Sequence, residues 1–177
     1  NNILKKKLET ELTFSKKTCD HLKGKSYWIV GGGTGYGQAI AVALAAANAK
    51  VYISGRRQDK LLETIDIIKK NKFNANMCIP IVMDSTMESS VQKAVKSIAE
   101  SSKGLFGMIY TAALSQGKNF SGRPLHFEPL ETWEKRLKTN VTGALICTRQ
   151  ASELMIGCDS MRVIFLTSTA GWAFTKG

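Results

Sequence analysis

One glycine-rich segment constrains the fold of this chain more than any other feature. It runs Trp28-Ile-Val-Gly-Gly-Gly-Thr-Gly-Tyr-Gly37 and continues directly into the alanine-rich run 38–47. Glycines let a backbone approach phosphate oxygens closely, and the unpaired N–H groups of a helix start carry partial positive charge. Because the glycines follow an apolar run and open a helical one, the segment predicts a dinucleotide site. A tight turn that needs glycine only for its backbone is the alternative.

Short apolar runs alternate with longer amphipathic runs from Lys25 onward, which is typical of repeated βαβ units around a parallel sheet. Each helical run is long enough for the crossover that parallel strands need. We therefore expect a Rossmann-type, doubly wound parallel α/β sheet with its first three strands in the order 3-2-1 and the fourth beside the first. The expected strands are Tyr27–Val30, Val51–Ser54, Cys78–Met83, Leu105–Tyr110 and Val163–Thr167, with helices at about 36–48, 58–71, 87–101 and 129–156.

Two of these elements carry further expectations. Pro80 cannot donate to a ladder, so the third strand, or its first half, should be irregular. The last helix repeats apolar residues along one side, which we expect to pack against the sheet. These residues are Trp133, Leu137, Val141, Leu145 and Ala151.

The composition fits one domain without a membrane span or a metal site. The 177 residues suit a single core, and no apolar run approaches the roughly 20 residues of a spanning helix. The 4 cysteines form no C-x-x-C pair and only 2 histidines accompany them. We therefore expect buried, reduced thiols and an intracellular, reducing compartment: the cytoplasm first, with a membrane-associated or organellar location as alternatives. The net charge of +11 is spread over helices with acidic neighbours, which favours a solvated basic surface over nucleic-acid binding.

Residues 1–24 follow a different pattern from the rest of the chain. Apolar residues recur there at roughly helical spacing among lysines: Ile3, Leu4, Leu8 and Leu12. We interpret this segment as an amphipathic leader helix that packs on the domain or contacts a partner or membrane surface. Two glutamates within it argue against a targeting presequence. The remaining residues, 25–177, form the expected NAD(P)-binding Rossmann domain.

The spacing Gly31-x-x-x-Gly35-x-Gly37 resembles the T-G-x-x-x-G-x-G turn of the short-chain dehydrogenase/reductase family. Val30 stands where the family has Thr. This change removes a hydroxyl that ties the turn to the neighbouring strand, so we expect a looser turn. The resemblance spans residues 25–177 and implies that the turn holds the pyrophosphate of a nicotinamide cofactor. The residues that it assigns to the cofactor here are Gly31, Gly33, Thr34, Gly35, Tyr36 and Gly37.

Two further segments resemble cofactor-binding positions of the family. Gly55 takes the place of the acid that grips the ribose of NAD(H), and Arg56 and Arg57 follow it. Because a guanidinium fork suits a 2′-phosphate, the resemblance favours NADP(H) over NAD(H), with a pair of surface arginines as the alternative. Asp84 and Ser85 resemble the dipeptide that contacts adenine, although both residue types also serve as helix N-caps.

The segment Tyr110-Thr-Ala-Ala113 stands where the family has Asn-Asn-Ala-Gly. In this resemblance Thr111 and Ala112 keep the backbone contacts to the cofactor, while both Asn side chains are absent. That departure is the main internal argument against full activity.

Two residues fall on catalytic positions of the family. Asn140 begins Asn140-Val-Thr-Gly143, which matches the family's Asn-Val-x-Gly, whose Asn helps to organise a proton-relay water. A buried Asn in an apolar helix needs partners for its amide. Ser168 falls on the catalytic Ser, where its hydroxyl would bond the substrate oxygen; a turn serine is the alternative. The family's Tyr-x-x-x-Lys does not occur within residues 1–177 at the expected place, so we expect no turnover from these residues alone.

These features support two functions of different classes. The first is an NADP(H)-dependent oxidoreductase that transfers hydride between the cofactor and a small alcohol or carbonyl compound, assembled as a homo-oligomer or with a partner subunit. The second is a non-catalytic subunit that keeps the fold in a larger assembly, favoured by Val30, by the altered Tyr110–Ala113 segment and by the lysine-rich leader. Nucleic acid is not an expected partner.

Overall fold

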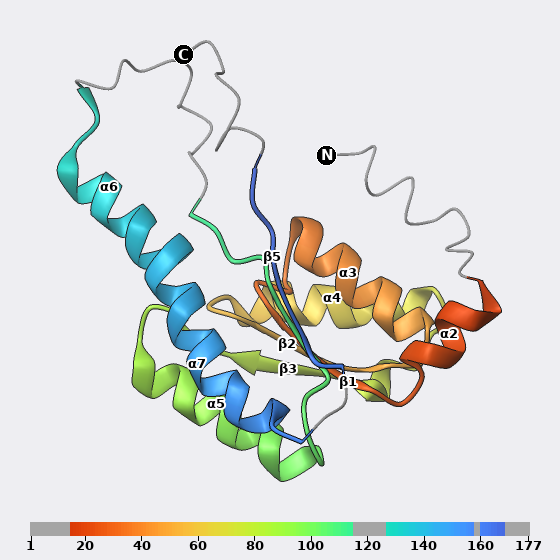
Figure 1. The fold of residues 1–177 in the computed structure, drawn as a ribbon. Coiled ribbons are helices and arrows are strands. Elements are labelled where there is room, and N and C mark those ends of the chain that lie inside the picture. The colour runs from red at the N-terminus through yellow and green to blue at the C-terminus, as the bar shows by residue number, and fades with distance from the viewer. Residues whose placement is uncertain (1–14, 115–126, 158–159, 169–177) are drawn as a thin grey trace.

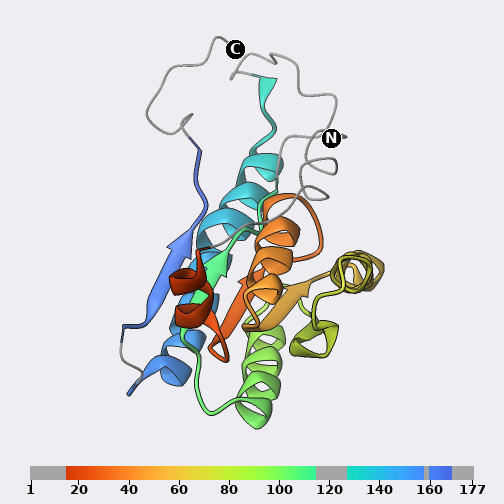
Figure 2. The same ribbon diagram turned by 90° about the vertical axis from the view of Figure 1, so that its right-hand side faces the viewer.

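A computed structural model describes residues 15–114, 127–157 and 160–168 of the chain. Five parallel strands form one sheet in the order β3-β2-β1-β4-β5, with helices on both faces (Figure 1), and β5 lies at an outer edge (Figure 2). The expected doubly wound α/β architecture and the expected order of the first four strands are confirmed. The strand order reverses between β1 and β4, which is where folds of this kind bind ligands.

The elements lie close to their expected positions. The strands are β1 Ser26–Val30, β2 Lys50–Gly55, β3 Cys78–Val82, β4 Gly107–Tyr110 and β5 Arg162–Phe165. The helices are α2 Lys16–Leu22, α3 Gly35–Ala46, α4 Gln58–Lys70, α5 Glu88–Ser101, α6 Leu130–Leu137 and α7 Gly143–Met155. A 3-10 turn, Ala75–Met77, precedes β3, and a π-helical turn, Lys138–Thr142, joins α6 to α7.

The side chains of β1 alternate between two cores, one on each face of the sheet. Trp28 and Val30 pack with α5 and α7, whereas Tyr27 and Ile29 pack with α3 and α4. Successive side chains of a strand point to opposite faces, and a central parallel strand is buried on both. Each fully buried large apolar side chain stabilises the fold by about 2–3 kcal/mol. The strand that leads into the glycine-rich turn is therefore firmly held.

The irregular third strand expected from Pro80 is not found. Pro80 pairs with Ile53 of β2 within an unbroken parallel register. Among the described strands β3 pairs with β2 alone, so it lies at an edge of the described sheet. On an edge the nitrogen that lacks a proton can face away from the ladder.

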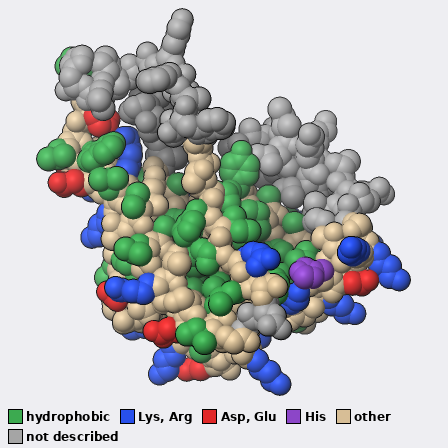
Figure 3. All heavy atoms as spheres, in the orientation of Figure 1, with side chains coloured by type: hydrophobic (Ala, Val, Ile, Leu, Met, Phe, Trp, Pro, Cys, Tyr) green, Lys and Arg blue, Asp and Glu red, His purple; other side chains and the backbone are tan. Residues whose placement is uncertain are grey.

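The expectation for the last helix was wrong in two respects. The π-helical turn interrupts it, and the stripe expected to pack is mostly exposed: Trp133, Leu137, Val141 and Leu145 are 42–65% exposed, and only Ala151 is buried. The buried side of α7 consists instead of Gly143, Ala144, Cys147, Ala151 and Met155. A π-turn adds one residue to a helical turn, so the stripe changes face between α6 and α7, and α6 itself has no buried residue. Figure 3 shows hydrophobic side chains gathered along α6 and α7 and over β5.

Residues 1–14 of the expected leader helix lie outside the described residues. The described remainder contains α2, which begins after Ser15, whose side chain accepts a hydrogen bond from the Thr18 N–H at 3.2 Å. Leu22 packs against the core formed with α3 and α4, and the His21 ring meets Phe106 edge-on. Among the described helices, none is long and apolar enough to cross a bilayer.

Candidate functional site

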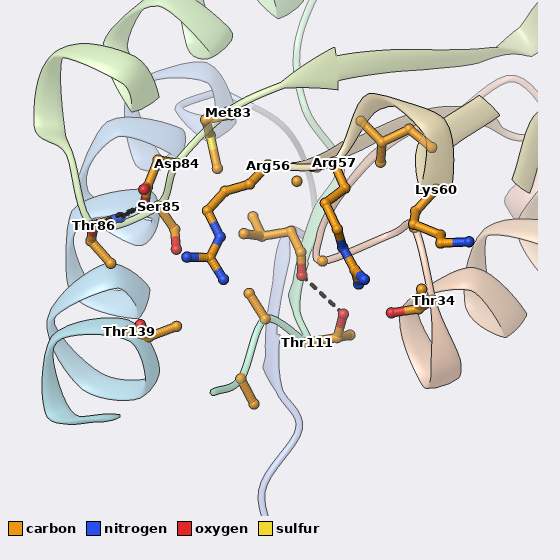
Figure 4. Close-up of a pocket in the computed structure, with 17 residues that line it drawn as sticks. Thr34, Arg56, Arg57, Lys60, Met83, Asp84, Ser85, Thr86, Thr111 and Thr139 are labelled. Atoms are coloured by element: carbon orange, nitrogen blue, oxygen red, sulfur yellow. Dashed lines mark hydrogen bonds between the residues drawn. The ribbon is translucent and has the colours of Figure 1, made fainter. Parts of the chain in front are cut away.

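A cleft opens at the carboxyl ends of β1, β2 and β4, beside the point where the strand order reverses (Figure 4). Most of the residues predicted to hold the cofactor line it: Gly31, Gly33, Thr34, Arg56, Arg57, Asp84, Ser85, Thr111 and Ala112. Three predicted residues, Gly35, Tyr36 and Gly37, do not. The cleft also contains residues that were not predicted: Val30, Gly55, Lys60, Leu61, Met83, Thr86, Ala113 and Thr139.

The glycine-rich turn is held from three neighbouring elements. Two of its N–H groups donate to the Ser54 carbonyl of β2. The Thr64 hydroxyl of α4 donates to the Gly32 carbonyl at 3.0 Å, and the Gln38 amide of α3 donates to the Gly33 carbonyl at 3.3 Å. The turn is therefore pre-formed. Thr34, the N-cap residue of α3, makes no side-chain capping bond. The first N–H groups of α3 are therefore available to an anion.

Thr111 fixes the turn from the opposite side. Gly31 has a φ of +94°, and a Cβ there would lie 2.7 Å from both Thr111 Oγ1 and Ala112 N. A Cβ on Gly37 would lie 2.3 Å from the Gly31 carbonyl oxygen, so both positions require glycine. The Thr111 hydroxyl donates to the Val30 carbonyl at 2.9 Å, alongside the Thr111 N–H at 2.8 Å. The extension of β4 thus supplies a hydroxyl at the end of β1, where Val30 has none. The looser turn expected from Val30 stays a prediction.

The charge of the cleft is mainly positive. Arg56 and Arg57 are exposed at its rim. Figure 4 shows Arg56 pointing toward Ser85 and Arg57 pointing toward Thr34, so the two guanidinium groups cover opposite ends of the cleft. Asp84 is the one acidic side chain among the described residues that line it. An anionic ligand fits this balance.

Asp84 is held by its own loop. Its Oδ1 atom accepts hydrogen bonds from the N–H and the hydroxyl of Thr86, both at 2.8 Å. Partial burial raises the pKa of this carboxyl, but the Thr86 bonds and the charges of Arg56 and Lys138 outweigh it and hold the pKa below its usual range. Met87 is the N-cap of α5, so the alternative interpretation of Asp84 and Ser85 as N-caps is wrong. Their contact with adenine stays a prediction.

A second pocket adjoins the cleft and shares Thr111, Ala112 and Ala113 with it. Both predicted catalytic residues, Asn140 and Ser168, line this pocket, and so does Tyr36, which was predicted to contact the cofactor. Apolar side chains of α7 and of β5 and its extension form much of the remaining wall: Ala144, Leu145, Phe165 and Leu166. The fold thus brings residues from four distant segments to one place.

Asn140 differs from its expected setting. It is exposed in the π-helical turn rather than buried in an apolar helix. Its Oδ1 atom accepts a hydrogen bond from the Leu114 N–H at 2.8 Å. The argument from burial was therefore wrong, although the side chain does have a partner. The bond ties the helix to the extension of β4.

Two residues that line the cleft show what sequence reasoning could and could not find. Lys60 lies in the first turn of α4, three residues after Arg57, and packs over Gly33. Its position just beyond the carboxyl end of β2 was a usable signal. Thr139 lines the cleft because it lies in the π-helical turn. No residue pattern in the sequence predicts such a turn.

Cys78 and Cys147 are buried free thiols. No group of three His, Cys, Asp or Glu side chains within the described part of the chain could hold a metal ion. Burial raises the pKa of Cys78 and of Cys147 to about 12, so both thiols stay protonated near neutral pH.

Comparison with known proteins decides the family. The model of the short chain dehydrogenase family matches residues 25–176. The chain belongs to this family. It is 30% identical over 148 residues to an uncharacterized oxidoreductase of Thermotoga maritima, covering 84% of this chain and 55% of that protein. It is 28% identical over 156 residues to the 3-oxoacyl-(acyl-carrier-protein) reductase of Aquifex aeolicus, covering 88% of this chain and 60% of that protein.

The fold agrees with solved structures of other short-chain dehydrogenases. A short-chain type dehydrogenase/reductase from Mycobacterium ulcerans superposes with a TM-score of 0.75 at 26% identity, covering 84% of this chain and 53% of that one. The chain thus spans between half and two thirds of the length of the relatives named here.

Proposed function

We propose that this protein is an NADP(H)-dependent oxidoreductase that transfers hydride between the cofactor and an alcohol or carbonyl substrate. The observation that carries the choice of cofactor is the pair Arg56 and Arg57 at the rim of the cleft, directly after Gly55. A carboxylate at the position of Gly55 would accept hydrogen bonds from ribose hydroxyls and repel a 2′-phosphate. Glycine followed by two guanidinium groups reverses that preference.

The arrangement of the cleft supports an extended dinucleotide. Asp84 and Ser85 lie at the end toward which Arg56 points, and the glycine-rich turn lies at the other. Adenine and the 2′-phosphate would occupy the first end, and the pyrophosphate would lie on the N–H groups of the turn and of α3. The glycines fit this group because a Cβ at Gly31 or Gly37 would collide with neighbouring atoms. NAD(H) fits the pyrophosphate site equally well, so the preference rests on the arginines.

The second pocket supports the catalytic half of the proposal. The bound nicotinamide would supply or accept the hydride. Ser168 lines the pocket, and its hydroxyl would donate a hydrogen bond to the substrate oxygen as charge develops there. Asn140 lies in the same pocket and would hold the water through which a proton reaches that oxygen. The proton donor itself would be the Tyr of the family's Tyr-x-x-x-Lys motif.

The comparisons support an enzyme over the non-catalytic subunit, because each relative named above carries an oxidoreductase, reductase or dehydrogenase name. The Aquifex aeolicus relative is named for a 3-oxoacyl group, which supports a carbonyl substrate here. We also propose a homo-oligomer or a partner subunit, and an NAD(P)-binding domain over 25–177 preceded by a leader helix. A cytoplasmic location remains part of this proposal.

The cofactor preference can be tested by titrating the full-length protein with NADPH and with NADH and following the fluorescence of the bound nicotinamide. The Arg56→Glu variant should weaken NADPH binding by roughly 10- to 100-fold, which corresponds to about 1–3 kcal/mol for a lost charge-assisted contact. NADH binding should change by less than about threefold. The matched control is Lys96→Glu, which makes the same charge change on the exposed side of α5. Equal affinity for both cofactors before and after the Arg56 change would sink the assignment.

A further inference from the structure

The hydroxyl of Tyr110 lies on the wall between the two pockets. Its oxygen is 3.2 Å from Ser85 Oγ and 2.5 Å from the Thr139 carbonyl oxygen. Ser85 and Thr139 line the cleft, whereas Tyr110 and Asn140 line the second pocket. The phenol therefore contacts groups that belong to both sites.

The directions of these two hydrogen bonds follow from the groups involved. A phenol has one proton, and a backbone carbonyl can only accept, so Tyr110 donates to the Thr139 carbonyl. The Tyr110 hydroxyl also lies 3.2 Å from Ser85 Oγ, which is the second acceptor within its reach. Burial raises the pKa of Tyr110 to about 12, with the Ser85 bond acting against that rise. The phenol stays protonated near neutral pH, and its hydroxyl bridges the Ser85 hydroxyl and the Thr139 carbonyl.

The Thr139 carbonyl needs this donor because of the π-helical turn. The Gly143 N–H, which would bond Thr139 in an α-helix, donates to the Lys138 carbonyl instead. A partly buried carbonyl without a donor is costly. Tyr110 replaces the donor that the π-turn withdraws, and so it stabilises the turn in this shape.

A second bond from the same strand extension holds the neighbouring residue. The Leu114 N–H donates to Asn140 Oδ1 at 2.8 Å, one residue after the carbonyl that Tyr110 holds. Gly143 leaves room for the arrangement, since a Cβ there would lie 2.7 Å from the Tyr110 oxygen and 3.1 Å from Ser85 Oγ. The segment Tyr110–Leu114 and the turn Lys138–Thr142 therefore form one hydrogen-bonded unit.

We infer that Tyr110 is a positioning residue: its hydroxyl links Ser85 on the cofactor side to the π-helical turn that carries Asn140 on the substrate side. This inference rests on the proposed function, because the contacts of the Tyr110 hydroxyl matter for catalysis only if a dinucleotide binds in the cleft. Dinucleotide contacts at Ser85 then order the turn, and Asn140 is held in place for the proton-transfer step.

Hydrogen exchange of the full-length protein, read by mass spectrometry with and without NADPH, tests this link. In the wild-type protein NADPH should slow exchange both in residues 31–37 and in residues 139–144. In Tyr110→Phe, exchange in 139–144 should be at least about tenfold faster and no longer respond to NADPH, while the response in 31–37 is kept. With a ketone that the wild-type protein reduces, kcat should fall at least tenfold while the KM for NADPH stays within twofold.

Two other variants make the test specific. Tyr52→Phe removes the hydroxyl of another buried tyrosine, one that bonds Ser101 away from both pockets, and it should leave the NADPH response of 139–144 unchanged. Gly143→Ala should loosen the turn as Tyr110→Phe does, because the added methyl group displaces the phenol. Its effect should be smaller in the Tyr110→Phe background, where the oxygen that it meets is gone.

The outcomes separate the two proposals. If NADPH slows exchange in 31–37 but Tyr110→Phe still shows the full response in 139–144, the positioning role is overturned while the proposed function stands. The same holds if 139–144 never responds in the wild-type protein. If NADPH slows exchange nowhere around the cleft, the proposed function fails, and the role of Tyr110 fails with it.

Discussion

Gly37→Ala is the smallest change that tests the geometry of the glycine-rich turn. Gly37 lies in the first turn of α3, and its α-carbon faces the backbone of Gly31 and the side chain of Thr111. The added methyl group would lie 2.3 Å from the Gly31 carbonyl oxygen, 2.4 Å from Thr111 Oγ1 and 2.9 Å from the Gly31 carbonyl carbon. Two of these three atoms belong to the backbone and cannot swing aside.

The free-energy cost of Gly37→Ala follows from how far the clashing atoms must move apart. Carbon and oxygen atoms that are not bonded to each other approach to about 3.3 Å, so the start of α3 and the Gly31 peptide must separate by about 1 Å. Overpacking of this kind costs about 3 kcal/mol at the upper end of its usual range. For a domain of this size that loss lowers the melting temperature by about 6–12 °C. The same displacement moves N–H groups of the cleft, so NADPH affinity should fall by more than about tenfold.

Gly35→Ala is the matched control. It adds the same methyl group two residues earlier, where no atom lies within 4 Å of the added Cβ. The strain that it introduces comes from the φ of +58° at this position. That conformation costs an alanine about 1 kcal/mol. Thermal unfolding and NADPH titration of both variants of the full-length protein should therefore rank Gly37→Ala well below Gly35→Ala. Equal melting temperatures, or unchanged NADPH affinity in Gly37→Ala, would refute the close approach on which the reasoning depends.

Two further predictions concern the hydrogen bonds around the cleft. Thr111→Val removes the hydroxyl that bonds the Val30 carbonyl and should lower the free energy of unfolding, measured in urea, by about 1 kcal/mol. Thr111→Ser retains a hydroxyl and should keep most of that stability. Equal losses in the two variants would contradict the role of the hydroxyl. The folded-state pKa of Asp84 lies below its ordinary value of 3.8, so its ionised form contributes stability above that pH and loses it as the pH falls through the lower folded value. The advantage of the wild-type protein over Asp84→Asn, followed by circular dichroism, should therefore be full at about pH 6 and shrink as the pH falls below 3.8. A pH-independent gap would show that the carboxylate charge is not its source.

The fold could be predicted from the sequence because its signals are local and repeated. Short apolar runs indicated each strand, and the glycine-rich turn between Val30 and α3 indicated where the first crossover begins. Right-handed crossovers then leave few sheet orders, and the observed order is the expected one. Pro80 was misjudged because its effect depends on whether the strand is central or at an edge. That is a property of the assembled sheet and not of the five residues of β3.

The residues that line the cleft were predicted less completely than the fold. Residues just beyond the end of a strand, such as Arg56 and Asp84, line the cleft because the carboxyl ends of parallel strands meet at one edge. Tyr36 was assigned to the cofactor cleft by its position in the motif, but it lines the second pocket. Adjacent residues at the start of a helix point about 100° apart, so neighbours in a motif can face different ligands.

The hydrogen bonds that shape the site could not be predicted from the sequence, and the physical reason is the same for each of them. The Thr111 hydroxyl meets the Val30 carbonyl 81 residues away, and the Tyr110 hydroxyl meets the Thr139 carbonyl 29 residues away. Each partner is a backbone carbonyl, which every residue carries, so no residue type at the accepting position marks the pair. Compared position by position with its family, the chain lacks a threonine at Val30 and two asparagines at Tyr110 and Thr111. In three dimensions, hydroxyls from the end of β4 hold both the glycine-rich turn and the helix that faces it. The departures at Val30 and Thr111 therefore meet in one hydrogen bond, while the Tyr110 hydroxyl bonds the π-helical turn on the other side of the strand extension.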